Sequence, residues 1–427
     1  MVMGQALALI ASTPAMTGAT QSIQFEVAGP GNLPVIGSSV VPSTGNLAEN
    51  TVLAVQPELS AVLFVTVDGS GAQNPGAPIE AGGQLRFATI ADVTGDGLAD
   101  IVTTSPATGR ANIVRQKADG GFSLGAVLPI GLQPFRPLAA DLNKDGLPEL
   151  LVPLRGEAKI AILPNLGDGL FSAGIRIETG PAPDSLALAD FDLDGVIDLA
   201  VTCTGNASIE VYFGSLEGSQ VEFSGPAVSL STGASPSGLI ALDFDGDGVP
   251  DLATACAGSA SVSMFYSDGA RGFQAGDFLF AGTAAQAIVS ADLDRDGLPD
   301  ITVANPTTQT LTVLHNSGSR SFSRSTIAMP FRPAHLAVLD ANDDDRPDLF
   351  TSSQTSVQTR VLLNTTNVEF CPGDITGDRR VGLPDLNLVL STFGTASGSG
   401  DANGDGEVTL ADLNLVLANF GQICGDR

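Results

Sequence analysis

The chain has 427 residues, of which 43% are hydrophobic, and it carries a formal net charge of −28 at pH 7. The apolar fraction supports a folded core and argues against general disorder. The acidic balance argues against nucleic-acid binding, which requires basic stripes. No run of eighteen apolar residues occurs, so we expect no membrane-spanning helix.

Residues 1–21 contain a short apolar stretch, 6–11, that is followed by small residues. The tripeptide 17–19 resembles a cleavage site, although the usual basic segment before the apolar stretch is absent. We expect a signal peptide here, and therefore a secreted or cell-surface protein. The alternative is a disordered tail.

Six acidic nonapeptides recur along the chain in the form Asp-x-(Asp/Asn/Thr)-x-Asp-Gly-x-x-(Asp/Glu), and Asp345 replaces the glycine in the sixth. Successive copies are 49, 49, 53, 49 and 48 residues apart, and we number these acidic loops one to six. A period near fifty residues is typical of a propeller blade. The loops begin at Asp92, Asp141, Asp190, Asp243, Asp292 and Asp340.

Each repeat is expected to form four short strands. Small apolar segments such as 185–189 precede the acidic loop, and segments such as 199–202 and 209–213 follow it. Turn residues between these runs predict an all-β fold. The fourth strand is expected to begin at a phenylalanine in a Phe-x-x-Gly pattern, at Phe122, Phe171 and Phe273.

The blade count depends on both ends of the repeat region. Segments 52–55 and 62–65 are strand-like, and their loop, 42–50, lacks the acidic ligands, so we expect a metal-free seventh blade. The sixth acidic repeat lacks its fourth strand, which the segment 22–27 can supply, and this closure removes open sheet edges. We predict a seven-bladed β-propeller over residues 22–368, with six calcium-loop blades.

Positions 1, 3, 5 and 9 of each acidic loop offer side-chain oxygens and position 7 a backbone carbonyl, a donor set that suits calcium. Without a cation the clustered carboxylates would repel one another, so we expect about six Ca²⁺ ions. The alternative is an Asp/Gly-rich turn without metal. The predicted ligands are Asp92, Thr94, Asp96, Leu98, Asp100, Asp141, Asn143, Asp145, Leu147, Glu149, Asp190, Asp192, Asp194, Val196, Asp198, Asp243, Asp245, Asp247, Val249, Asp251, Asp292, Asp294, Asp296, Leu298, Asp300, Asp340, Asn342, Asp344, Arg346 and Asp348.

Residues 371–427 contain a twofold repeat, in which 383–394 matches 410–421 at an offset of 27. Apolar residues at i, i+3, i+4 and i+7 predict two helices, with Gly394 and Gly421 as C-caps. The predicted apolar faces consist of Leu386, Val389, Leu390 and Phe393 in one copy, and Leu413, Val416, Leu417 and Phe420 in the other.

The acidic segments 374–385 and 401–412 of this repeat resemble the twelve-residue, EF-hand-like loops of a type I dockerin, and that resemblance implies one or two further Ca²⁺ ions. Arg379 replaces the usual glycine of the first loop. The ligands that this resemblance implies are Asp374, Thr376, Asp378, Arg380 and Asp385 in the first loop, and Asp401, Asn403, Asp405, Glu407, Thr409 and Asp412 in the second.

Four cysteines and two histidines complete the chemistry-bearing residues. Cys371 and Cys424 bracket the twofold module, so we expect a disulfide and an oxidising compartment. Cys203 and Cys256 occupy equivalent positions in adjacent blades, too far apart for a bridge, and are expected to be buried free thiols. For His315 we expect a surface or packing role.

No catalytic triad, zinc spacing or phosphate loop is present, and we predict that the chain is not an enzyme. Five polar residues precede the inner strands and are expected to line the face opposite the acidic loops. They are Arg86, Arg136, Asp184, Gln286 and His335.

The acidic loops resemble the FG-GAP and VCBS repeats of seven-bladed propellers, as in integrin α subunits and calcium-containing fungal lectins. That resemblance implies metal between the first two strands of each blade, and protein or glycan ligands on the opposite face or between blades. Residues 371–427 resemble a type I dockerin, a small α-helical, EF-hand-like module whose loop positions 10 and 11 contact a cohesin. Those positions are Leu383-Pro384 and Leu410-Ala411 here.

The sequence therefore suggests a secreted, calcium-stabilised binding or adhesion propeller with an extracellular protein or glycan ligand and a dockerin-like attachment module with a cohesin-like partner. Two alternatives stay open: a lyase-type polysaccharide-active enzyme on a calcium propeller, and a purely structural envelope component.

Overall fold

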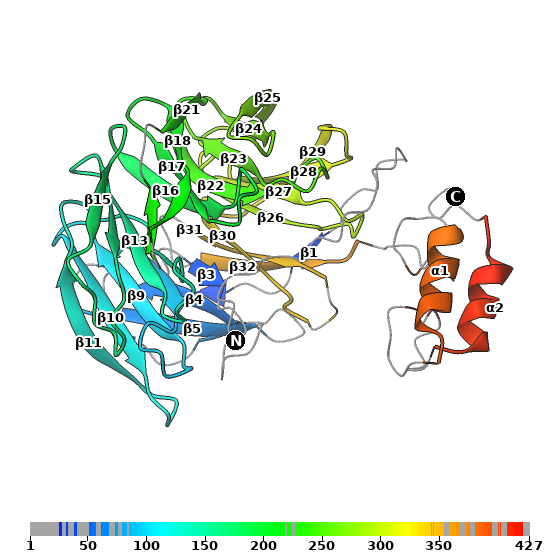
Figure 1. Cartoon of the computed structure of the whole chain (residues 1–427), viewed down its shortest axis with the longest axis horizontal. Helices are drawn as coiled ribbons and strands as arrows, with labels where there is room; N and C mark the ends of the chain where they lie inside the picture. The colour runs from blue at the N-terminus through cyan, green and yellow to red at the C-terminus, as the bar shows by residue number, and fades with distance from the viewer. Residues whose placement is uncertain are drawn as a thin grey trace.

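The computed structural model describes residues 25–27, 31–32, 38–40, 51–56, 61–67, 73–75, 79–82, 85–217, 220–223, 227–342, 344, 346–353, 358–366, 373, 375, 381–394, 400, 402 and 408–421. The fold is an all-β propeller, with two short helices near the C-terminus (Figure 1). No helix within these ranges is long and apolar enough to cross a membrane.

Six sheets that each carry an acidic loop form blades, and in each the loop connects the innermost strand to the second strand. The first blade contains β8 (Phe87–Ala91), β9 (Asp100–Ser105), β10 (Arg110–Gln116) and β11 (Phe122–Pro129). The second contains β12 (Leu138–Ala140), β13 (Glu149–Leu154), β14 (Lys159–Leu163) and β15 (Ile175–Glu178). The third contains β16 (Pro183–Ala189), β17 (Asp198–Cys203), β18 (Ser208–Tyr212) and β21 (Val228–Ser231).

The next two blades repeat this antiparallel order. The fourth contains β22 (Pro236–Leu242), β23 (Asp251–Cys256), β24 (Ser261–Ser267) and β25 (Phe273–Phe280). The fifth contains β26 (Ala287–Ala291), β27 (Asp300–Asn305), β28 (Thr310–Asn316) and β29 (Phe322–Ala328). The sixth contains β30 (Pro333–Leu339), β31 (Asp348–Ser353) and β32 (Gln358–Asn364), with β1 (Phe25–Val27) and β2 (Gly31–Asn32) both paired to β32.

The N-terminal strand completes the sixth blade as predicted, because β1 pairs antiparallel with β32 and places Phe25 opposite Asn364. A further sheet contains β3 (Ser38–Val40), β4 (Thr51–Gln56), β5 (Ala61–Val67), β6 (Gln73–Pro75) and β7 (Ile79–Glu80). Its strand β3 contacts both β30 and β8. The predicted metal-free loop, 42–50, lies outside the described residues.

Two details of the strands differ from the prediction. Phe171 does not open a fourth strand: it forms an isolated bridge with Asn165, and β15 begins only at Ile175. The 53-residue step accommodates an additional hairpin of β19 (Gly214–Glu217) and β20 (Gln220–Phe223), which displaces the fourth strand of that blade to β21.

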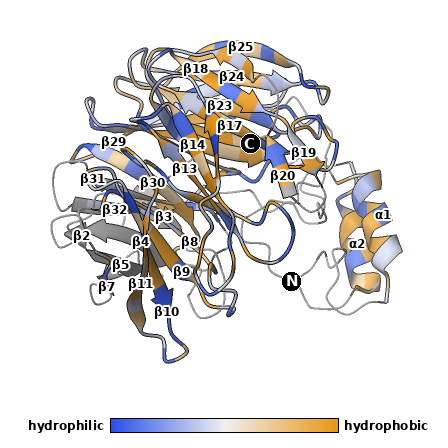
Figure 2. Ribbon diagram, turned by 60° about the vertical axis from the view of Figure 1, so that its left-hand side comes forward, coloured by the Kyte–Doolittle hydropathy of each residue, from blue (hydrophilic) through white to orange (hydrophobic). Residues whose placement is uncertain are grey.

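The hydrophobic core lies between blades. Val102 and Ile113 of one blade pack with Leu150 and Val152 of the next, and each second strand from β9 to β31 is buried along its length. Figure 2 shows apolar residues along β13 and β17. Inner strands approach so closely that a Cβ on Gly238 would lie 2.7 Å from the Ile288 Cγ2 atom, which explains the small residues there.

Helices α1 (Leu383–Thr392) and α2 (Leu410–Ala418) contact one another, as the twofold repeat predicted. Gly394 and Gly421 follow them with positive φ angles of 82° and 87°, the left-handed conformation expected of C-cap glycines.

The predicted apolar faces of the helices are only partly buried. Val389 and Val416 are fully buried. Two residues of each predicted face are exposed and form the same apolar surface on both helices. They are Leu390, Phe393, Leu417 and Phe420. The two short helices bury a narrower face than the periodicity suggested.

Candidate functional site

The acidic loops share one hydrogen-bond pattern, which loop three illustrates. The Asp190 carboxylate accepts the Asp194 N–H at 3.1 Å and the Gly195 N–H at 2.8 Å, and the Asp194 carboxylate accepts the Val196 N–H at 2.8 Å. In all six loops the carboxylate at position 1 accepts the N–H of position 5, and the carboxylate at position 5 accepts the N–H of position 7. The N–H groups of each loop thereby hold the predicted ligands at positions 1 and 5 in place within that loop.

The ninth residue of each loop is a buried carboxylate that opens the second strand. Asp251 is fully buried and accepts the Phe244 N–H at 3.0 Å and the Ser267 N–H at 2.9 Å. Its equivalents accept the corresponding loop N–H in every copy: Asp100, Glu149, Asp198, Asp300 and Asp348. These side chains connect the loop to its own blade in addition to their predicted ligand role.

Three loops bring at least three acidic ligand atoms within 4.8 Å of one another. These groups are Asp190, Asp192 and Asp194 in loop three; Asp243, Asp245 and Asp251 in loop four; and Asp292, Asp294 and Asp296 in loop five. Among the described residues, loops one, two and six form no such group. Several acidic clusters therefore have the spacing of a metal site.

Burial and neighbouring carboxylates raise the acid pKa values in these loops. The pKa rises to about 8 for Asp251, about 7 for Asp296 and about 6 for Asp198, with burial as the larger cause in each. An added cation would offset this repulsion.

The donor atoms fit a hard cation. Asn342, at position 3 of loop six, has a buried Oδ1 atom without a hydrogen-bond partner among the described residues. Oxygen donors of this kind are the ligands that calcium takes.

His315 differs from the sequence expectation, because it contacts predicted ligands of loop five. Its Nδ1 lies 3.0 Å from Asp300 Oδ1, and its Nε2 lies 3.4 Å from Asp294 Oδ2. The hydrogen bond with Asp300 raises the pKa of His315. Since β28 carries His315 alongside β27, the contact arises from strand pairing and not from sequence proximity.

Most predicted ligands of the C-terminal loops lie outside the described residues, as do Cys371 and Cys424. Asp385 is buried and accepts the Gly382 N–H at 2.7 Å, and Asp412 accepts the Thr409 N–H at 2.7 Å. Both carboxylates lie in the first turn of their own helices, at the N3 position, and cap the helix N-termini by accepting the N-cap N–H. Within the blades, Cys203 and Cys256 are buried free thiols, as predicted.

A cavity of about 1020 Å³ lies at the opposite end of the inner strands from the acidic loops. On β16, Asp184 lines the cavity and loop three begins at Asp190, six residues later, or about 20 Å along an extended strand. All five polar residues expected on that face line it: Arg86, Arg136, Asp184, Gln286 and His335. The sequence reasoning missed Arg155 and Phe135, which also line it.

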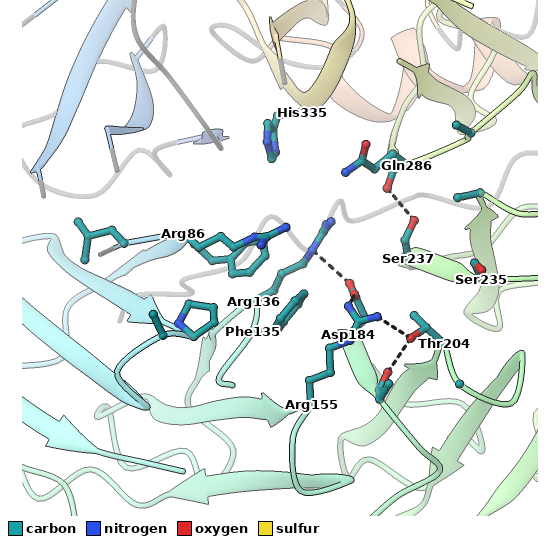
Figure 3. A pocket seen from close by; sticks show the side chains of 18 residues that line it. Arg86, Phe135, Arg136, Arg155, Asp184, Thr204, Ser235, Ser237, Gln286 and His335 are labelled. Atoms are coloured by element: carbon teal, nitrogen blue, oxygen red, sulfur yellow. Dashed lines mark hydrogen bonds and ion pairs between the residues drawn. The ribbon is translucent and has the colours of Figure 1, made fainter. Parts of the chain in front are cut away.

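Figure 3 shows arginines and aromatic rings on one side of this cavity, with His335 and Gln286 facing them. Asp184 pairs with Arg155 at 3.0 Å and with Arg136 at 3.5 Å. Burial raises the pKa of Asp184, and the arginines oppose that rise. Burial, together with Arg136 and Arg86, lowers the pKa of His335 to about 3, so its imidazole is neutral at pH 7.

Solved structures with a similar fold include two propellers named for lactonases. A putative 6-phosphogluconolactonase from Bacteroides fragilis has a TM-score of 0.52 and 14% identity, covering 70% of this chain and 85% of that chain. The periplasmic gluconolactonase PpgL of Pseudomonas aeruginosa has the same score and identity, covering 70% and 86%. BBS1N, solved in complex with ARL6DN, has a TM-score of 0.58 and 12% identity, covering 81% and 99%.

The prediction that the chain is not an enzyme is wrong as an inference from its sequence, because structures of the same fold carry enzyme names. The prediction relied on motifs of neighbouring residues. At a propeller axis, however, the functional groups arrive one or two per blade, as the cavity here illustrates, so no contiguous motif is expected.

A sequence search of curated proteins finds no match. The FG-GAP-like repeat matches residues 68–152, 190–254, 243–303 and 292–351, which together cover more than half of the chain and include all or part of every acidic loop. The chain belongs to the FG-GAP-like repeat family.

Proposed function

We propose that the chain is a calcium-stabilised binding propeller, secreted or at the cell surface, which takes an extracellular protein or glycan ligand at its central cavity. One observation carries the proposal: the carboxylates gather at one end of the inner strands, while arginines and aromatic rings gather around a cavity at the other. Metal and ligand would therefore occupy opposite faces, and the metal role would be structural.

The sheet β3–β7 would be a seventh, metal-free blade. Its inner strand β3 contacts β30 of the sixth acidic blade and β8 of the first, which is the position of a blade that closes the ring. Ring closure leaves no blade face unpaired.

Calcium would occupy about six propeller loops and one or two C-terminal loops. Eight ions would bring the formal charge from −28 to −12. Isothermal titration of metal-free protein with CaCl₂ tests this stoichiometry. A count near zero at millimolar calcium would contradict it.

The helix pair would be the dockerin-like attachment module with a cohesin-like partner. Leu383 and Leu410, at the loop positions that contact cohesin in the resembling family, are 65% and 64% exposed. Paired Leu383→Asp and Leu410→Asp changes should abolish capture of such a partner without changing the unfolding temperature of the propeller.

Glycan arrays and fractionated extracellular proteins test the binding function. Ala107 is exposed and lines the cavity, so Ala107→Trp should fill part of the cavity without disturbing a buried contact. We expect a specific ligand that the wild type binds and this variant loses. The isosteric change Asp247→Asn, which removes one carboxylate charge from loop four, is the control and should retain ligand binding in saturating calcium.

A second candidate is hydrolysis of a sugar lactone in the same cavity, for which His335 provides the specific observation. Its neutral imidazole faces two arginines. Water would add to the lactone carbonyl while His335 accepts its proton and the arginines stabilise the oxyanion. His335 would then return that proton to the ring oxygen as the ring C–O bond breaks, giving a hydroxy acid and the neutral imidazole. Gluconolactone hydrolysis above the spontaneous rate, lost in His335→Gln, would support it; an unchanged rate in that variant would exclude it.

A further inference from the structure

We propose that the central cavity binds a small polyhydroxylated molecule carrying one oxyanion, a carboxylate or a phosphate. Arg86 and Arg136 would hold the anionic group, and the opposite wall would contact the hydroxyl groups. The proposal rests on the cavity being the binding site and adds the chemical class of its ligand.

The charge of the cavity is opposite to that of the chain. The whole sequence has 47 acidic and 19 basic residues, yet the described residues that line the cavity include three arginines and a single carboxylate. That carboxylate, Asp184, is only 7% exposed at its side chain and pairs with Arg136 and Arg155. Asp184 thus orients two arginines and leaves a net positive cavity, which favours an anion.

Arg86 is the arginine that remains available. It is exposed, and the structure records no hydrogen bond or ion pair of its side chain among the described residues. Its guanidinium lies 5.6 Å from the ring centroids of Phe87 and Phe135, which are themselves 4.9 Å apart. This stacking restricts the guanidinium without using its N–H donors, the groups that bind carboxylate or phosphate in a bidentate manner.

Arg136 reaches the same side of the cavity from the next blade. Its guanidinium lies 5.6 Å from the Phe87 ring, and its Nε atom forms the 3.5 Å ion pair with Asp184, which orients the guanidinium beside that ring. Figure 3 shows the Arg86 and Arg136 side chains pointing into the cavity together. Two guanidinium groups on one aromatic platform form a site for one oxyanion.

The opposite wall is polar but uncharged. Ser235, Ser237, Gln286 and His335 face the arginines across the cavity (Figure 3). The Ser237 hydroxyl donates to the backbone carbonyl of Gln286 at 2.9 Å, so the hydroxyl oxygen can still accept a hydrogen bond. Hydroxyl, amide and neutral imidazole groups match the hydroxyl groups of a sugar.

The cavity volume of about 1020 Å³ lies at the upper end of the range of about 300–1,000 Å³ for small-molecule sites. The space suits a sugar acid or sugar phosphate with accompanying water. The arginine side carries too little free positive charge to bind a polyanion, because its third arginine, Arg155, already pairs with Asp184 and Thr204.

Titration calorimetry of the calcium-loaded full chain tests the proposal with gluconate, glucose 6-phosphate and neutral glucose as probes. We expect at least one anionic probe to bind about tenfold or more tightly than glucose, and the tighter anion identifies carboxylate or phosphate as the recognised group. Arg86→Gln should weaken that binding about tenfold, and Arg86→Lys should recover part of it. Arg324→Gln, which removes an exposed arginine on the outer strand β29, should have no effect.

Two results would overturn the proposal. One is glucose binding as tightly as both anions; the other is Arg86→Gln binding like the wild type while retaining its unfolding temperature. If both anionic probes fail but an array ligand is lost in Ala107→Trp, the ligand class is wrong while the binding function survives. If nothing binds and Ala107→Trp changes nothing, both proposals fail.

Discussion

Arg320 pairs with Asp245, the third residue of acidic loop four, across the boundary between two blades: its Nη2 atom lies 2.8 Å from Asp245 Oδ2. The same guanidinium stacks on Tyr266 of that preceding blade at 4.2 Å. Arg271 repeats the arrangement one blade earlier, pairing with Asp192 of loop three. The turn of one blade therefore holds a predicted metal ligand of the blade before it.

Both arginines have an unfavourable backbone conformation. Arg271 and Arg320 have φ angles of 69° and 63°, whereas the equivalent positions in the first two blades are Gly120 and Gly169. A left-handed residue with a side chain costs about 1–2 kcal/mol. The contacts with the preceding blade offset this cost.

The first prediction concerns that coupling. A double-mutant cycle of Arg320→Ala and Asp245→Asn should give an interaction energy of about 0.5–1 kcal/mol, because the arginine is partly exposed and screened by solvent. Denaturant unfolding in saturating calcium provides the measurement. Strictly additive effects would show that the pair contributes nothing.

The second prediction is a pH dependence that calcium removes. Folding raises the pKa of Asp251 to about 8, of Asp296 to about 7 and of Asp100 to about 6, from an ordinary value of 3.8. A raised folded-state pKa contributes stability below the unfolded value, and that contribution is lost as pH rises through the folded value. Metal-free protein should therefore lose stability between about pH 4 and pH 8.

Saturating calcium favours the ionised carboxylates and should flatten this loss. Thermal midpoints measured across that range, with calcium and with a chelator, provide the test. Parallel pH curves in the two conditions would disagree with the account.

The third prediction separates two roles within loop four. Asp251→Asn places an amide N–H₂ against one of two buried backbone N–H donors, those of Phe244 and Ser267, and should cost about 1–3 kcal/mol even without metal. Asp247→Asn, at an exposed loop position, should weaken calcium binding while changing metal-free stability little. Chemical unfolding and calcium titration of both variants compare these effects, and equal metal-free stabilities would refute the distinction.

The fourth prediction concerns the buried thiols. Burial raises the pKa of Cys203 to about 12 and also raises that of Cys256. Because the thiolate is the reactive form, iodoacetamide should label neither residue in native protein at pH 8 and both after denaturation. Peptide mapping by mass spectrometry identifies the labelled residues; rapid native labelling of either one would be inconsistent with this core.

The repeat period predicted much of the fold because each loop is a local structure. It located the acidic blades, and the missing strand of the sixth blade led to Phe25 on β1. The contacts that cross blades had no local pattern. Arg320 and Asp245 are 75 residues apart in the chain, and only the packing of the blades brings them together.

The cavity was predictable in part. Arg86 and His335 lie six and five residues before the acidic loops of their repeats, so the direction of the inner strands alone places them on one face. Arg155 follows a second strand and enters the cavity through its pairing with Asp184 and Thr204. Such a contact depends on the relative placement of two blades, which the sequence pattern does not encode.

We expect the clustered carboxylates to hold the propeller together only with a bound cation, and the thermal midpoint in excess EDTA tests this dependence most directly. The midpoint should fall markedly relative to saturating calcium and recover when calcium is restored, because metal binding free energy is also folding free energy. A midpoint that is unchanged in excess EDTA would contradict the claim.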